Sequence, residues 1–150
     1  MKIFMDIDGV LANIDHRLRY QKEKDYDRFY SPEELSKDTA IPMGIRMLED
    51  FWELERIIYV TGRPERTRDA TKRFLAKEAI DSPIAENLLM RKDGDHRPSD
   101  VIKIELIGQA LREGEEAIFI DDDPKNVIAV EKAFPRVTGI IFSARRLKNY

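Results

Sequence analysis

Three short apolar segments of this chain end in residues that could carry out chemistry. The polar residues that follow these segments are Asp6-Ile7-Asp8, Thr61-Gly62-Arg63 and Asp121-Asp122. Lys103 lies early in the helical pattern that precedes the last segment. Carboxylates crowded on one rim repel one another unless a cation joins them, and carboxylate oxygens are ligands that a hard cation such as Mg²⁺ prefers. The residue types therefore predict a functional site with a divalent cation, which packing alone would not require.

The apolar segments have the composition of buried strands, and amphipathic helical patterns lie between them. The predicted strands cover residues 2–5, 57–60, 88–90, 117–120 and 139–142. The predicted helices cover residues 43–54, 64–77, 98–111 and 124–134. This alternation predicts an open, parallel α/β sheet with helices on both faces. Ligands of such sheets sit beyond the carboxyl ends of the strands, where the polar residues named above would meet.

Length and composition limit the class of protein. A chain of 150 residues with 42% hydrophobic residues fits one compact domain, residues 1–150. It contains no cysteine, which excludes disulfides and thiolate chemistry and fits a cytoplasmic location. No apolar run approaches the roughly 18 residues of a membrane span, and the N-terminus lacks the pattern of a secretory signal. The net charge of −3 argues against a uniformly basic nucleic-acid binder, so local basic patches matter more.

The segment of residues 11–42 fits the strand–helix alternation least well. Residues 11–22 are predicted to form a short helix, and residues 24–39 are polar and interrupted by Ser31-Pro32. We expect this segment to be a loop or small helical flap over the site, and thus a minimal cap. Tyr26, Phe29 and Tyr30 would either stack on a nucleic-acid base or pin the flap to the core, and both alternatives stay open.

The motifs together resemble a known family. Asp6-Ile7-Asp8-Gly9-Val10-Leu11 resembles the first motif, DxDG(T/V)L, of the haloacid dehalogenase superfamily of phosphatases. Thr61-Gly62-Arg63, Lys103 and Ile120-Asp121-Asp122 resemble the second, third and fourth motifs in the same order. The resemblance spans residues 3–126 and implies a Rossmann-like sheet and Mg²⁺-dependent hydrolysis of phosphate monoesters.

The resemblance also implies roles for individual residues. Asp6 would attack phosphorus and become an aspartyl phosphate, and Asp8 would act as the general acid and then as the general base. Thr61 and Lys103 would hold the phosphoryl oxygens. The Mg²⁺ ligands that it implies are Asp6, the backbone carbonyl of Asp8, Asp121 and Asp122.

A finer resemblance concerns the substrate. Residues 91–103, with the pattern RxxGDxRxxDxxK, resemble the phosphatase domain of phage-type polynucleotide kinase-phosphatases, which remove 3′-phosphates from nucleic-acid ends. The expected substrate-binding residues are Arg17, Gly62, Arg63 and Arg97. Ser99 departs from that family, which often has acidic residues at both this position and the next; here only Asp100 is acidic, and it would orient Lys103 or Arg63. A guanidinium suits this task because it can hold two phosphate oxygens at once.

Simpler interpretations account for some charged residues. Asp123 precedes Pro124 and is expected to cap a helix, and Lys72 and Arg73 are expected to lie on a solvated helix face. Receiver domains of two-component signalling also combine acidic residues, Thr and Lys on such a sheet. There, however, the acidic pair follows the first strand, and here it follows a later one.

Three functions follow as hypotheses. The first is a Mg²⁺-dependent polynucleotide 3′-phosphatase acting on DNA or RNA ends. The second is a phosphatase for nucleotides or sugar phosphates, and the third is a non-catalytic domain that binds phosphorylated ends. The sequence lacks the phosphate-binding loop of a kinase. A standalone phosphatase, a piece of a longer enzyme, and a subunit with a kinase or ligase partner therefore all remain open.

Overall fold

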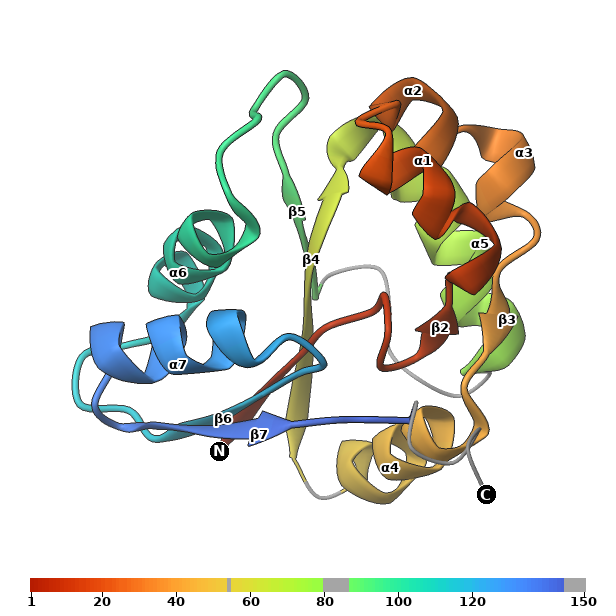
Figure 1. Cartoon of the computed structure of the whole chain (residues 1–150). Coiled ribbons are helices and arrows are strands. Elements are labelled where there is room, and N and C mark those ends of the chain that lie inside the picture. Colours follow the sequence, from red (N-terminus) through yellow and green to blue (C-terminus); the bar gives the residue numbers. More distant parts are fainter. Residues whose placement is uncertain (54, 80–86, 145–150) are drawn as a thin grey trace.

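The main sheet of this protein is parallel, with five strands among the described residues. The computed structural model describes residues 1–53, 55–79 and 87–144. The strands stand in the order β5-β4-β1-β6-β7, with β1 at the centre (Figure 1). Their bounds are Lys2–Met5 for β1, Arg56–Pro64 for β4, Leu88–Arg91 for β5, Ala117–Asp121 for β6 and Val137–Ile141 for β7. The predicted α/β, Rossmann-like fold is confirmed.

Helices cover both faces of this sheet (Figure 1). One face carries α4 (Pro42–Trp52) and α5 (Arg68–Glu78), and the other carries α6 (Ser99–Ala110) and α7 (Pro124–Ala133). Two apolar cores result, and β1 contributes to both because side chains alternate along a strand. The predicted helix 43–54 corresponds to α4, although its last predicted residue, Leu54, lies outside the described residues.

Strand β4 continues past its predicted end at Val60. The pairing of β4 with β5 shifts between Thr61 and Pro64, and Pro64 then pairs with Arg91. The irregularity gives β4 extra residues at the rim of the sheet, as a β-bulge does. The predicted helix 64–77 starts later for the same reason: a 3₁₀ turn, η2 (Glu65–Thr67), comes first and α5 follows it.

Residues 11–41 of the expected flap segment contain short helices and two short strands, and we call them the flap; its role as a minimal cap stays a prediction. Its elements are β2 (Ala12–Asn13), η1 (Asp15–Arg17), α1 (Leu18–Lys22), α2 (Tyr26–Phe29), α3 (Pro32–Leu35) and β3 (Thr39–Ala40). Strands β2 and β3 pair with each other in antiparallel fashion at the base of the flap. The expectation of one short helix over 11–22 is wrong in its bounds, because residues 12–13 are taken up by β2.

Within the described residues, none of the helices has the length and apolar character needed to cross a lipid bilayer. The cytoplasmic location and the single-domain organisation stay predictions.

Helix α4 packs so closely on the turn after β1 that its third residue must be glycine. A Cβ atom at Gly44 would collide with the backbone carbonyl oxygen of Val10. We expect Gly44→Ala to lower the free energy of unfolding by about 1–3 kcal/mol, as overpacking does. Replacing a helical glycine by alanine ordinarily stabilises a protein by up to about 1 kcal/mol.

Gly108→Ala in α6 is the matched control. A Cβ atom there would lie 3.4 Å from the ring of Phe134, an ordinary contact, so this variant should be neutral or more stable. Denaturant unfolding of both variants measures the difference. A stabilised Gly44→Ala variant would contradict the close approach.

Candidate active site

The turn after β1 fixes the directions of Asp6 and Asp8. The carbonyl of Ile7 accepts hydrogen bonds from the backbone N–H groups of Val10, Leu11 and Ala12. Gly9 has φ +84°, a region that favours glycine, and a Cβ atom there would also collide with the Asp122 carboxylate. This tight turn therefore places the acidic residues of β1 and β6 against each other only because residue 9 has no side chain.

Three carboxylates form a cluster at the carboxyl ends of β1 and β6. One oxygen each of Asp6, Asp121 and Asp122 lies within 4.8 Å of the others. We call these residues the acidic triad. Its donors are all carboxylate oxygens, the ligand type that Mg²⁺ prefers, and it contains three of the four predicted metal ligands. The carboxylate of the fourth, Asp8, points to another cluster, so only its carbonyl would serve, as predicted.

Lys103 compensates the charge of the acidic triad. Its ammonium donates hydrogen bonds to Asp6 Oδ1 at 2.6 Å, to the Val60 carbonyl at 2.9 Å and to Asp121 Oδ2 at 3.1 Å. Its side chain is only 1% exposed. Burial would lower the pKa of Lys103, but the charges of Asp121 and Asp6 outweigh it and raise the pKa above its ordinary value. The lysine is therefore held in its charged form, in contact with the predicted nucleophile.

Lys103 alone does not compensate all of the negative charge of the acidic triad. Burial, and then the neighbouring Asp121, raise the pKa of Asp6 well above its ordinary range. The same two causes raise the pKa of Asp122 to about 7. A divalent cation would lower both pKa values, because it favours the ionised carboxylates. The electrostatics as well as the donor atoms thus fit a bound cation.

Two neighbours of Asp121 complete its hydrogen bonds. Asn126 Nδ2 donates to Asp121 Oδ2 at 3.1 Å, and the backbone N–H of Asp123 donates to Asp121 Oδ1 at 2.9 Å. The side chain of Asp123 caps α7 by accepting from the Lys125 N–H, so the interpretation of Asp123 as a helix cap is confirmed. Asn126 was not predicted, although its place in the first turn after the Asp121–Asp123 run could have indicated it.

Asp8 belongs to a second cluster, in which two arginines are shared by two carboxylates. Arg63 donates to Asp8 Oδ1 from Nη2 at 2.6 Å, and Arg17 donates to the same oxygen at 3.1 Å. Asp38 accepts from both arginines as well, at 2.7 Å from Arg63 and 2.9 Å from Arg17. We call Asp8, Arg17, Asp38 and Arg63 the arginine cluster. The structure thus brings both predicted substrate arginines next to the predicted general acid.

The arginine cluster holds Asp8 in its ionised form. Burial would raise the pKa of Asp8, but the guanidinium charges of Arg63 and Arg17 outweigh it and lower the pKa below its ordinary value. Burial would lower the pKa of Arg63, and Asp8 in turn raises it. Asp38 escaped prediction because it lies in a flap crowded with charged residues, and nothing in the local sequence distinguishes it from its neighbours.

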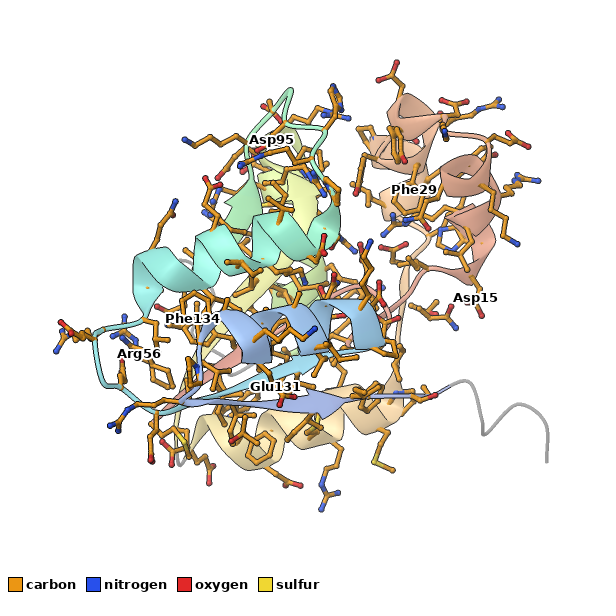
Figure 2. All side chains as sticks on the ribbon, turned by 60° about the vertical axis from the view of Figure 1, so that its left-hand side comes forward. Asp15, Phe29, Arg56, Asp95, Glu131 and Phe134 are labelled. Carbon is orange, nitrogen blue, oxygen red and sulfur yellow. The ribbon has the colours of Figure 1, made fainter. Side chains whose placement is uncertain are left out.

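A cleft of about 1080 Å³ opens over the acidic triad. The flap, with Phe29, stands on one side and the loop around Asp95 on the other (Figure 2). Among the predicted site residues, the cleft is lined by Asp6, Asp8, Gly62, Arg97, Lys103, Asp121 and Asp122. The other three, Arg17, Thr61 and Arg63, are buried behind this surface.

Three aromatic residues of the flap, expected either to stack on a base or to pin the flap to the core, lie in different environments. Phe29 is buried beneath the guanidinium of Arg17, 4.5 Å from its ring centre, and Tyr30 packs edge-on against Phe29. The Tyr30 hydroxyl donates to the Gly62 carbonyl at 3.4 Å. Tyr30 thus pins the flap to the rim of the sheet, whereas Phe29 packs against its neighbours within the flap. All three residues line the cleft, and Tyr26, at 43% exposed, is the most exposed of them.

The loop after β5 is held by Arg91. This arginine donates to the carbonyls of Gly62 at 2.8 Å, Asp95 at 3.0 Å and Arg97 at 2.6 Å. Arg97 itself pairs with Asp95 and with Glu105, both at 2.7 Å. Arg91 therefore positions the loop, and Arg97 lies at the cleft with its charge already compensated.

The arrangement of sheet, acidic triad and buried lysine defines a hydrolase of the haloacid dehalogenase-like class. A haloacid dehalogenase-like hydrolase from Streptococcus pneumoniae is similar in fold, with a TM-score of 0.68 at 15% identity over 99% of this chain and 90% of that one. More specifically, the chain belongs to the family described as the polynucleotide kinase PNKP phosphatase domain, whose model matches residues 1–135.

Two solved chains from Pnkp1/Rnl/Hen1 complexes have a similar fold. A chain from a Pnkp1/Rnl/Hen1 complex superimposes with a TM-score of 0.75 at 23% identity over 95% of this chain. A chain from a Pnkp1/Rnl/Hen1 RNA repair complex gives 0.73 at 24% identity, also over 95%. The present chain spans only 46% and 43% of those two chains. Comparison with curated proteins gives no match.

The pKa of Asp122 predicts a pH-dependent response to Mg²⁺. Because this carboxyl binds its proton more tightly in the folded chain, the stability that it contributes is present below about pH 4 and is lost as the pH rises through about 7. Bound Mg²⁺ would relieve this loss, so its stabilising effect should be larger at pH 8 than at pH 5. At a concentration of about 100 times its dissociation constant, Mg²⁺ adds about 2.7 kcal/mol to the free energy of unfolding. This corresponds to a rise of roughly 5–10 °C in melting temperature.

Thermal melts with and without Mg²⁺ measure this effect, and two variants control it. Asp122→Asn should raise the melting temperature without metal and remove most of the Mg²⁺ response. Asp123→Asn changes a neighbouring carboxylate that serves only as a cap, and asparagine caps nearly as well, so its response should match that of the unchanged protein. Equal Mg²⁺ responses in the two variants would refute the site.

Proposed function

We propose that this protein is a Mg²⁺-dependent phosphatase that removes 3′-phosphates from polynucleotide ends through an aspartyl-phosphate intermediate at Asp6. The observation that carries the proposal is the contact of a buried, charged Lys103 with Asp6 beside two further carboxylates. Membership of the PNKP phosphatase-domain family supports the choice of substrate. When bound by the acidic triad and the Asp8 carbonyl, Mg²⁺ would neutralise charge on the phosphate.

In the first step, the Asp6 carboxylate forms a bond to phosphorus, and the bond from phosphorus to the 3′-oxygen breaks. Asp8 gives its proton to the departing oxygen. Lys103 and Thr61 hold the phosphoryl oxygens as charge spreads over them. Because Asp8 is held ionised by two arginines in the described arrangement, its ion pairs must loosen before it can carry that proton.

In the second step, Asp8 takes a proton from a water molecule, which attacks the phosphorus of the aspartyl phosphate. The bond between phosphorus and the Asp6 oxygen breaks, and inorganic phosphate leaves. The ionised form of Asp8 is the one that this step needs, and Arg63 and Arg17 favour it. The same residue thus serves as acid and base in turn.

The shape of the cleft supports a large substrate. Sites for small molecules typically measure about 300–1,000 Å³, and this cleft, of about 1080 Å³, lies just above that range. The exposed ring of Tyr26 offers a surface on which a base near the 3′ end could stack. Arg17 and Arg63 remain the proposed phosphate contacts, although reaching substrate would require them to turn from Asp38 or Asp8.

We also infer that the phosphatase works beside end-processing partners. Two solved chains of similar fold come from assemblies with Rnl and Hen1, one of them called an RNA repair complex. A ligase partner, on the same chain or a separate one, would use the 3′-hydroxyl that this reaction leaves, and a kinase partner would phosphorylate the opposite 5′ end. DNA and RNA ends are both consistent with this chemistry.

The substrate proposal predicts a preference that phosphate release can measure. A 3′-phosphorylated oligonucleotide should be hydrolysed with a higher kcat/KM than a 3′-nucleotide monophosphate or an aryl phosphate, and EDTA should stop all three reactions. Asp6→Asn should abolish turnover without loss of folding. Activity confined to the two small esters would refute the polynucleotide substrate and favour the small-molecule phosphatase. Tight binding of phosphorylated ends without any release would favour the non-catalytic domain.

The two-step mechanism predicts that Asp8→Asn traps its intermediate. With an aryl phosphate, whose leaving group needs no proton, the first step should proceed and the second should stall. Intact-mass spectrometry should then detect one phosphoryl group per chain, located at Asp6 after digestion. The double variant Asp6→Asn/Asp8→Asn should remain unmodified. A phosphoryl group on any other residue would overturn the assignment of the nucleophile.

A further inference from the structure

We propose that Asp38 is a positioning residue of this site, which holds Arg17 and Arg63 together against Asp8 and so fixes the flap to the catalytic rim. The proposal rests on the proposed phosphatase function. It concerns a residue on the flap, 32 positions after the proposed nucleophile in the sequence.

The contacts of Asp38 are unusually complete for a residue in a small flap. Its side chain is 0% exposed. Oδ1 accepts from Arg17 Nε at 2.9 Å, and Oδ2 accepts from Arg17 Nη2 at 2.9 Å and from Arg63 Nη2 at 2.7 Å. The bidentate pair with Arg17 fixes the plane of that guanidinium, because both groups are planar and their hydrogen bonds are parallel.

These contacts join parts of the chain that the backbone does not join. Arg17 and Asp38 belong to the flap, whereas Arg63 lies near the end of β4 and Asp8 follows β1. Both arginines bind the same oxygen of Asp8, Oδ1. Without the charge of Asp38, two buried guanidiniums would face one carboxylate, and their mutual repulsion would move one of them away. Asp38 therefore sets where the two arginines stand relative to the proposed general acid.

A second buried carboxylate of the flap provides a matched comparison. Glu34 pairs with Lys37 at 3.2 Å and lies 3.8 Å from His16, and its side chain is 10% exposed. These partners belong to the flap, and His16 also lies 3.4 Å from Asp38. A variant at Glu34 thus removes a flap carboxylate but leaves the charge of Asp38 and its bonds to both arginines in place.

The test compares two substrates on the same sample of each variant. An oligonucleotide 3′-phosphate needs a proton on its leaving oxygen, whereas a 4-nitrophenyl phosphate does not, and kcat/KM reports the steps up to departure of that group. We expect Asp38→Asn to lower the ratio of kcat/KM for the oligonucleotide to kcat/KM for 4-nitrophenyl phosphate by about 10- to 100-fold. Small misplacements of catalytic groups have effects of this size. Glu34→Gln should leave the ratio unchanged. The ratio does not depend on the fraction of chains that are folded.

Arginine Nε–H signals in NMR spectra give a readout that is independent of activity. Buried, hydrogen-bonded Nε–H groups exchange slowly with water, so the Arg17 signal should be protected in the unchanged protein and in Glu34→Gln, and lost in Asp38→Asn. If Asp38→Asn does not fold, Asp38→Glu keeps the charge but displaces both guanidiniums, and it should shift the same signal and lower the same ratio.

The outcomes separate this proposal from the proposed function. An unchanged ratio, or an equal fall with both substrates, would refute a positioning role for Asp38. An unprotected Arg17 signal in the unchanged protein would refute the contact itself. If the unchanged protein hydrolyses neither substrate while the Arg17 signal behaves as expected, the proposed function fails and Asp38 is only structural.

Discussion

The ammonium of Lys103 is the constraint on which the rest of the site depends. It bonds to Asp6 at the end of β1, to Asp121 at the end of β6 and to the Val60 carbonyl of β4. One charge thus ties together three adjacent strands of the sheet. Without it, the acidic triad would be a set of buried like charges, an arrangement that strongly destabilises a folded protein. The bonds of Lys103 to these carboxylates, together with the apolar packing of α6, therefore fix the position of this helix.

The site consists of two charge clusters that meet at one turn. Asp6 and Asp8 are separated by the buried Ile7, and their side chains enter different environments. Burial and the neighbouring carboxylates raise the pKa of Asp6 against the opposing charge of Lys103, whereas the arginines around Asp8 outweigh burial and lower its pKa. Two aspartates two residues apart are thereby made chemically different. Such a separation of pKa values is how neighbouring carboxyl groups acquire distinct tasks.

The fold was predictable from sequence because each strand of the main sheet falls on a short apolar run. The runs of β1, β4, β5 and β6 are largely buried in the structure, whereas that of β7 is largely exposed. The acidic triad was predictable because its residues follow the runs of β1 and β6 directly, and the carboxyl ends of parallel strands lie on one edge. Lys103, which lies in α6, was predictable only from its place among the motifs. Asp38 was not predictable, since its role depends on the way the flap folds back onto β4, which no local pattern encodes. The same holds for the extension of β4 to Pro64, which depends on pairing with β5.

The closed base of the flap has a consequence for how this architecture can change. Strands β2 and β3 pair Ala12 with Ala40 and Asn13 with Thr39, and the Ile41 N–H donates to the Leu11 carbonyl at 2.8 Å. The two points where the flap leaves and re-enters the body are therefore neighbours. Lengthening a loop between fixed ends costs only about 0.6 kcal/mol for each doubling. Descendants of this chain could exchange the flap for a larger or smaller insertion, and so admit different substrates, while the sheet and the acidic triad stayed as they are.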